Sequence, residues 1–199
     1  GAENAGKPGY YTVKSGDTLI RIALEDVRTI AQGASIPLVV ADELPTALLY
    51  GDRRQLQTAL RKQGVAARVH NAGVSGDTTT AGRARLGWVL AGLKAKPDLA
   101  IVELGANDML RGQPPAQARA NLDAILADLK RRKIPVLLAG MQASYNLDRR
   151  YRAEFNAIYP GLARKHGARL YPFFMDGVAG NRTLLLGDQM HPNGKGVAV

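Results

Sequence analysis

The stretch LAIVELGANDMLRG, residues 99–112, decides the fold, because an apolar run ends abruptly in a polar loop. Leu99–Leu104 is short, apolar and contains β-branched side chains, which predicts a buried strand. The loop that follows carries Asn107 and Asp108. In a sheet of parallel strands, loops of this kind gather at the carboxyl edge, where sites for ligands and chemistry form.

The same pattern repeats along most of the chain. Short apolar runs predict further strands, and amphipathic stretches between them predict helices. Strands that alternate with helices imply right-handed crossovers and a parallel sheet covered on both faces. We therefore expect an α/β fold, a three-layer sandwich with a central parallel sheet. The predicted strands are Leu38–Val40, Ala67–His70, Leu99–Leu104, Val136–Ala139 and Leu170–Phe173, and the predicted helices span 52–63, 80–94, 116–131 and 149–166.

Two of the loops after strands carry donors suited to a developing oxyanion. Gly76 lies in GVSGDTTT, a tight turn ahead of a helix, where its backbone N–H can point into a cleft. The side-chain amide of Asn107 follows the next strand as a second donor. Capping is the alternative interpretation, in which Asp77 or Thr78, and likewise Asn107, only begin the following helices.

The last loop contains an aspartate three residues before a histidine. Asp188 can hold the Nδ1 proton of His191 and leave Nε2 as a general base. The alternative is a polar surface turn, because Asp-x-x-His is a weak pattern by itself. A base, an orienting acid and two oxyanion donors at the strand ends of one domain together favour a catalytic site.

Composition narrows the class of protein. The 199 residues, 46% of them hydrophobic, are enough for one ordinary core, and no apolar run is long enough for a membrane span. The absence of cysteine excludes disulfides and thiolate sites. The net charge of +10 favours anionic partners. The basic clusters at 130–133 and 149–152 have helical period, so solvated helix ends explain them, and we expect no nucleic-acid binding.

Several motifs in chain order resemble the SGNH, or GDSL-type, hydrolases. They are NAGVSGDTT, ELGANDMLRG, FNAIYP, LYPFF and GDQMHPNGKGVA, between about residues 36 and 199. The similarity is closest to the bacterial thioesterase I, lysophospholipase and arylesterase group. It implies a flavodoxin-like fold, no cofactor or metal, a periplasmic or secreted location, and small acyl esters or thioesters as substrates.

The resemblance also implies roles for individual residues. His191 would be the base, Asp188 its orienting acid, and Gly76 and Asn107 the oxyanion donors. Met141 and Tyr145, in the loop after the fourth strand, would line an acyl pocket; the alternative is ordinary loop packing.

The nucleophile departs from the family pattern. The first strand of these enzymes runs into a Gly-Asp-Ser-Leu turn, and LVVADELPTALLYG puts Glu43 where the serine is expected. A carboxylate has no proton to give and forms only a labile anhydride with an acyl group. Other hydroxyls nearby are Thr46, Ser75 and Ser144. A catalytically impaired protein that binds cell-wall glycans is therefore the alternative function.

The first part of the chain suggests a separate segment. YYTVKSGDTLIRIALE, residues 10–25, resembles the opening of a LysM module, a fold that binds glycans such as peptidoglycan. About half a module is visible, up to about residue 31. We expect an N-terminal segment at 1–35 and a hydrolase-like domain at 36–199 that lacks the family's last helix.

Overall fold

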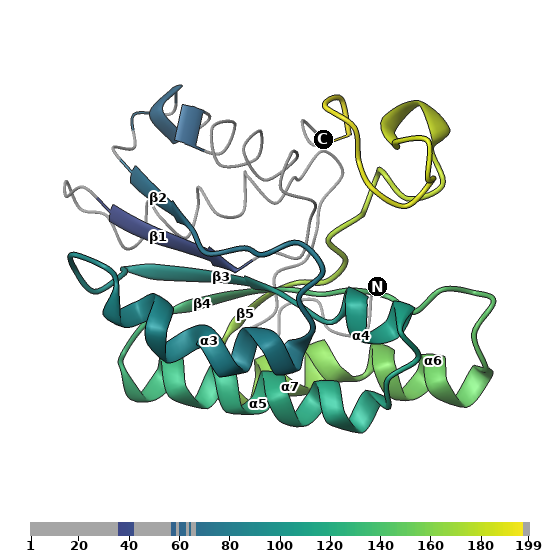
Figure 1. Cartoon of the computed structure of the whole chain (residues 1–199), viewed down its shortest axis with the longest axis horizontal. Helices are drawn as coiled ribbons and strands as arrows, with labels where there is room; N and C mark the ends of the chain where they lie inside the picture. The colour runs from purple at the N-terminus through teal and green to yellow at the C-terminus, as the bar shows by residue number, and fades with distance from the viewer. Residues whose placement is uncertain (1–35, 42–56, 59, 63, 65–66, 197–199) are drawn as a thin grey trace.

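The central sheet has five parallel strands in the order β2-β1-β3-β4-β5 (Figure 1). The computed structural model describes residues 36–41, 57–58, 60–62, 64 and 67–196. All five predicted strands are present, each within a few residues of its predicted ends. Their bounds are β1 Ile36–Ala41, β2 Ala67–Asn71, β3 Leu99–Glu103, β4 Val136–Ala139 and β5 Arg169–Tyr171.

Helices follow the strands in alternation, as expected. They are α3 Thr79–Ala91, α4 Ala106–Leu110, α5 Pro115–Arg131, α6 Arg149–Asn156 and α7 Ile158–His166, with a 3-10 turn at Arg182–Leu184. Figure 1 shows α3, α5 and α7 below the sheet and the helical residues 57–58 and 60–62 above it. The three-layer α/β fold is confirmed. No helix in the described part of the chain is long and apolar enough to cross a membrane.

The main core lies between the sheet and the layer of α3, α5 and α7. All five residues of β3 are buried, as a central parallel strand requires. From the helices, Leu122, Leu126 and Phe155 pack against the same cluster with exposures of 1% or less. This rigid layer holds the strand ends in place, and the loops after the strands carry the candidate site.

The predicted helix over 149–166 is wrong in one respect, because two helices occupy this stretch. Pro160 lies four residues after Asn156 and has no N–H to donate to its carbonyl oxygen. The helical hydrogen-bond series is therefore interrupted, and α6 ends at Asn156. The short helix α4 and the 3-10 turn are also additions that periodicity over so few residues does not reveal.

A tyrosine from α7 fixes the end of β3. Buried Tyr159 donates its hydroxyl to the carbonyl oxygen of Leu104 at 2.9 Å. Gly105 has φ +120°, and a Cβ there would lie 2.3 Å from the Tyr159 hydroxyl oxygen. Only glycine fits this position, so the Leu-Gly pair after the strand is required by packing as well as by the turn.

Candidate active site

The loop after β2 and helix α4 meet at the carboxyl edge of the sheet. The side-chain amide of Asn107 donates to the carbonyl oxygen of Asp77 at 3.0 Å. Arg111 donates to the carbonyl oxygen of Gly76 at 2.7 Å. Gly76 has φ +82°, a turn conformation that side chains disfavour. The fold therefore brings the two candidate oxyanion donors into neighbouring positions.

Capping explains one of these polar loops and not the other. Thr78 is the N-cap of α3, and its hydroxyl accepts from the N–H of Ala81 at 3.4 Å. In α4 the N-cap is Gly105, and no side chain caps that helix. The amide of Asn107 instead reaches across to the β2 loop, so the capping alternative for Asn107 is wrong.

A buried polar network holds these two loops together. The carboxylate of Asp108 accepts from the backbone N–H of Thr79 at 2.7 Å and from its hydroxyl at 2.6 Å. Asn121 of α5 donates to the Thr79 hydroxyl oxygen at 3.2 Å and to that of Thr80 at 2.9 Å. Asp108 is 1% exposed and Thr79 fully buried. Because Asp108 follows Asn107 directly, this network sets the position of the Asn107 amide relative to the β2 loop.

Asp188 and His191 form the pair that their spacing predicts. Asp188 Oδ2 lies 2.7 Å from His191 Nδ1, and Oδ1 accepts the backbone N–H groups of Met190 and His191 at 2.9 and 3.0 Å. The backbone N–H of His191, then that of Met190, then the imidazole lower the pKa of Asp188 from 3.8 to about 2. An ionised carboxylate only accepts, so Nδ1 donates to Asp188 and Nε2 does not take part in this pairing.

The loop that carries the pair is fixed by its own backbone. Leu185 and Pro192 form an isolated antiparallel bridge, and Leu186 donates its N–H to the carbonyl oxygen of His191 at 2.7 Å. The amide of Asn193 donates to the carbonyl oxygens of Thr183 and Leu185, both at 3.0 Å. The side chain of His191 is 29% exposed and that of Asp188 is 41% exposed. The imidazole is therefore held in orientation and still open to a substrate.

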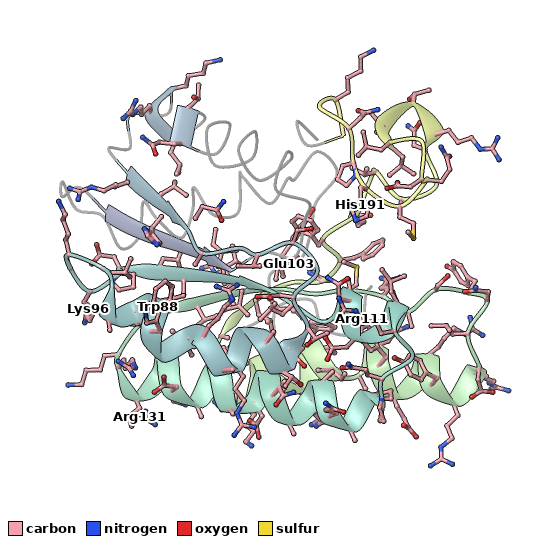
Figure 2. All side chains as sticks on the ribbon, in the orientation of Figure 1. Trp88, Lys96, Glu103, Arg111, Arg131 and His191 are labelled. Carbon is pink, nitrogen blue, oxygen red and sulfur yellow. The ribbon has the colours of Figure 1, made fainter. Side chains whose placement is uncertain are left out.

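Figure 2 shows His191 on the C-terminal loop, at the same end of the molecule as Arg111. Since Arg111 contacts the Gly76 loop, the four candidate site residues Gly76, Asn107, Asp188 and His191 lie at one end of the molecule. The sequence motifs did not indicate that Arg111 contacts the Gly76 loop or that Asp108 positions Asn107. Arg111 lies four residues after Asn107, and this spacing puts both residues on one face of a helical turn, a usable signal.

The loop after β4 separates the two residues predicted to line an acyl pocket. Met141 is half-buried and packs against both the main core and the cluster of Met175, Val178 and Leu185. Tyr145 is 89% exposed, with the Arg152 guanidinium 5.8 Å from its ring centroid. Met141 therefore lies between two apolar clusters, whereas Tyr145 lies on the outer surface of the loop, and the lining role of both residues stays a prediction.

Three sequence-based expectations fall outside the described residues. Glu43 and Thr46, near the expected position of the nucleophile, belong to 42–56, and the LysM-like stretch belongs to 1–35. Of the other candidate hydroxyls, Ser75 and Ser144 are both exposed.

The chain is similar in sequence and in fold to known hydrolases. A family profile, the "GDSL-like Lipase/Acylhydrolase family", matches residues 29–199. The chain belongs to this family. It is 38% identical to Esterase TesA of Pseudomonas aeruginosa over 166 residues, which cover 81% of this chain and 82% of the relative.

Two further relatives are similar. Thioesterase 1/protease 1/lysophospholipase L1 of Escherichia coli is 42% identical over 125 residues, which cover 63% of this chain and 59% of that protein. The crystal structure of AlinE4, described as an SGNH-hydrolase family esterase, superposes with a TM-score of 0.74 at 47% identity, covering 84% of this chain and 92% of the other. The family resemblance inferred from the motifs is confirmed.

Proposed function

We propose that this family member hydrolyses carboxylic esters or thioesters through an acyl-enzyme. His191 acts as the base, Asp188 orients it, and the Gly76 N–H and the Asn107 amide stabilise the oxyanion. The observation that carries the proposal is the 2.7 Å pairing of Asp188 Oδ2 with His191 Nδ1, at the edge where Asn107 contacts the Gly76 loop. The relatives named above are esterases and a thioesterase, which supports the same reaction class.

In this reaction His191 Nε2 takes the proton of an attacking hydroxyl, whose oxygen bonds to the acyl carbon as the ester or thioester bond breaks, and passes that proton to the leaving alkoxide or thiolate. Water then attacks the acyl-enzyme by the same route. The charge on the tetrahedral intermediate falls near the Asn107 amide. A charge-stabilising donor of this kind typically contributes 10²–10³-fold to kcat.

Exposed apolar side chains support an acyl substrate. Of the described large hydrophobic residues, six are exposed, and four of these lie on the segments that carry the candidate site residues: Val74 in the loop after β2, Leu110 at the end of α4, and Leu186 and Met190 in the loop of the Asp188–His191 pair. Apolar groups close to a catalytic pair favour a substrate with a hydrocarbon chain. We expect Met190→Gln to lower kcat/KM more for a p-nitrophenyl octanoate than for the acetate.

The first experiment is hydrolysis of p-nitrophenyl butyrate by the mass-verified protein and two histidine variants. His191→Ala is expected to reduce the rate to background. His70→Ala is the matched control, because this exposed histidine lies on β2 and not on the loop that carries the pair. Equal rates in all three proteins would overturn the assignment of the base.

The second experiment identifies the nucleophile. Labelling with a fluorophosphonate and peptide mapping is expected to find an adduct that His191→Ala abolishes, which names the reacting hydroxyl. If neither an adduct nor hydrolysis is found, the chain is a binding protein on this scaffold. A gain of activity in Glu43→Ser would then show that the remaining groups are intact.

We also propose a periplasmic or secreted location, on the family resemblance alone. Release of the native protein by osmotic shock would support it. Binding of residues 1–35 to peptidoglycan and a domain boundary near residue 36 stay predictions, and sedimentation with insoluble peptidoglycan, with and without these residues, tests the former.

A further inference from the structure

Positive charge is concentrated at the amino edge of the sheet, opposite the candidate site. Four parts of the chain form this basic edge: the described residues among 57–68 (57–58, 60–62, 64 and 67–68), and the segments 92–98, 123–136 and 164–169. They contain twelve Lys and Arg residues and three Asp residues, a net charge of +9, whereas the whole chain carries +10. The basic residues are Arg61, Lys62, Arg68, Lys94, Lys96, Lys130, Arg131, Arg132, Lys133, Arg164, Lys165 and Arg169.

The three acids at this edge offset only part of that charge. Asp128 pairs with Arg131 and Arg132, and Asp123 with Lys165 and His166. The loops are tied to one another, because Lys96 Nζ donates to the carbonyl oxygen of Lys133 at 3.4 Å. The loop before β3 and the loop before β4 therefore belong to one surface, rather than to separate helix ends.

An exposed tryptophan lies beside this surface. Trp88, the only tryptophan in the chain, is 81% exposed in the last turn of α3. One helical turn before and after Trp88, the exposed residues are the uncharged Ala84 and Ala91. The exposed Lys94 and Lys96 come next in the chain. Figure 2 shows Trp88, Lys96 and Arg131 at the end of the molecule away from His191.

A partly apolar hollow opens on the same edge. It has a volume of about 280 Å³, and both basic side chains (Lys130, Lys133) and apolar ones (Leu126, Pro135, Val136) line it, together with His166. Cations around an apolar hollow can bind the phosphate headgroup of a lipid while the hollow accommodates part of its acyl chain. A charged polymer would instead need a continuous row of cations along the surface.

We propose that the basic edge docks on an anionic lipid surface, with Trp88 at the level of the headgroups. Indole rings favour the membrane interface, and each nearby Lys or Arg adds attraction to anionic lipids. Nucleic acid is the less suitable partner, because a single aromatic side chain provides no series of stacking positions. In this orientation the carboxyl edge faces away from the bilayer, and docking is independent of the proposed function.

Trp88 makes the test direct, because all tryptophan emission comes from this one side chain when the excitation is selective for tryptophan over tyrosine. The full chain is titrated with vesicles of phosphatidylglycerol and with vesicles of phosphatidylcholine in 0.1 M salt, a concentration at which the Debye length is about 10 Å. We expect a blue shift of the emission with phosphatidylglycerol only, and quenching by brominated lipid.

Variants separate this surface from net charge. Vesicle sedimentation is expected to show about 10-fold weaker binding for Trp88→Ala and about 30-fold weaker binding for Lys94→Gln/Lys96→Gln. Arg149→Gln/Arg182→Gln is the matched control, because it removes the same charge from the opposite edge and should bind nearly as the parent does. Circular dichroism confirms that each variant is folded.

Two results would overturn the proposal. One is the absence of any blue shift with phosphatidylglycerol. The other is an equal loss of binding in both double variants, which would mean attraction by net charge alone. Neither outcome depends on whether the chain hydrolyses esters.

Discussion

Asp188 accepts three hydrogen bonds within its own turn, and these bonds lower its pKa by an amount that can be measured. The N–H of His191 and that of Met190, with the imidazole, favour the ionised carboxylate and hold its pKa at about 2. A lowered folded-state pKa contributes stability that is complete above 3.8 and is lost as the pH falls toward 2. We expect the carboxyl ¹³C shift of Asp188 to titrate near pH 2, and a midpoint near 3.8 would contradict the geometry.

The same residue should matter more for catalysis than for folding. Asparagine at position 188 can still accept the backbone N–H groups, but it no longer holds the imidazole in the required tautomer. We expect Asp188→Asn to lower kcat for p-nitrophenyl butyrate by about 10²–10⁴-fold with little change in KM. Asp176→Asn, an exposed acid in the same part of the chain, is the control and should leave kcat unchanged.

At the scale of elements, helices α5 and α7 end in similar ways with different residues. At the end of α5, the backbone N–H of Lys133 donates to the carbonyl oxygen of Lys130 at 2.9 Å, and that of Ile134 donates to the carbonyl oxygen of Leu129 at 3.0 Å. These two bonds form a Schellman motif, in which Lys133 is the left-handed residue at φ +56°. In α7 the left-handed residue is Gly167 at φ +69°.

A side chain in this backbone region costs about 1 kcal/mol. Lys133→Gly should therefore raise the free energy of unfolding by about 1 kcal/mol, and Gly167→Ala should lower it by a similar amount. Urea denaturation measures both changes. Shifts of the same sign in the two variants would mean that the turn conformation does not govern stability here.

The polar network between α3, α4 and α5 is the second testable feature at this scale. Thr79→Val removes the hydroxyl that Asp108 and Asn121 share, so a buried carboxylate loses a charge-assisted hydrogen bond. We expect a loss of about 1.5–3 kcal/mol in the free energy of unfolding by urea. Thr80→Val is the matched control, because Thr80 is exposed and water can replace its hydroxyl. Equal effects of the two substitutions would refute a special role for the buried hydroxyl.

At the scale of the whole molecule, the two edges of the sheet differ in charge and in chemistry. Twelve Lys and Arg residues at the basic edge repel one another, and salt screens this repulsion. We expect sodium chloride, raised from about 0.02 to about 0.3 M, to increase Tm by about 2–4 °C in calorimetry. Lys94→Gln/Lys96→Gln should reduce this increase more than Arg149→Gln/Arg182→Gln does; the reverse order would place the repulsion elsewhere.

The sequence by itself determined the layout of the fold. Apolar runs of strand length and amphipathic stretches predict local backbone, and their alternation leaves little choice but a parallel sheet. The Asp188–His191 pair was equally predictable, since both residues lie within one short turn whose geometry is local. The break between α6 and α7 was missed because Pro160 acts through one missing hydrogen bond inside a continuous amphipathic pattern.

Only the tertiary structure decided which distant residues meet. Asn107 contacts Asp77 across 30 positions, and Asn121 reaches Thr79 across 42. The spacing of hydrophobic residues along the sequence carries no information on such pairs. They depend on the order of the strands and on how each helix packs on the sheet. The gathering of basic residues at the amino edge has the same origin: parallel strands return every crossover loop to one side, and cations far apart in the chain become neighbours.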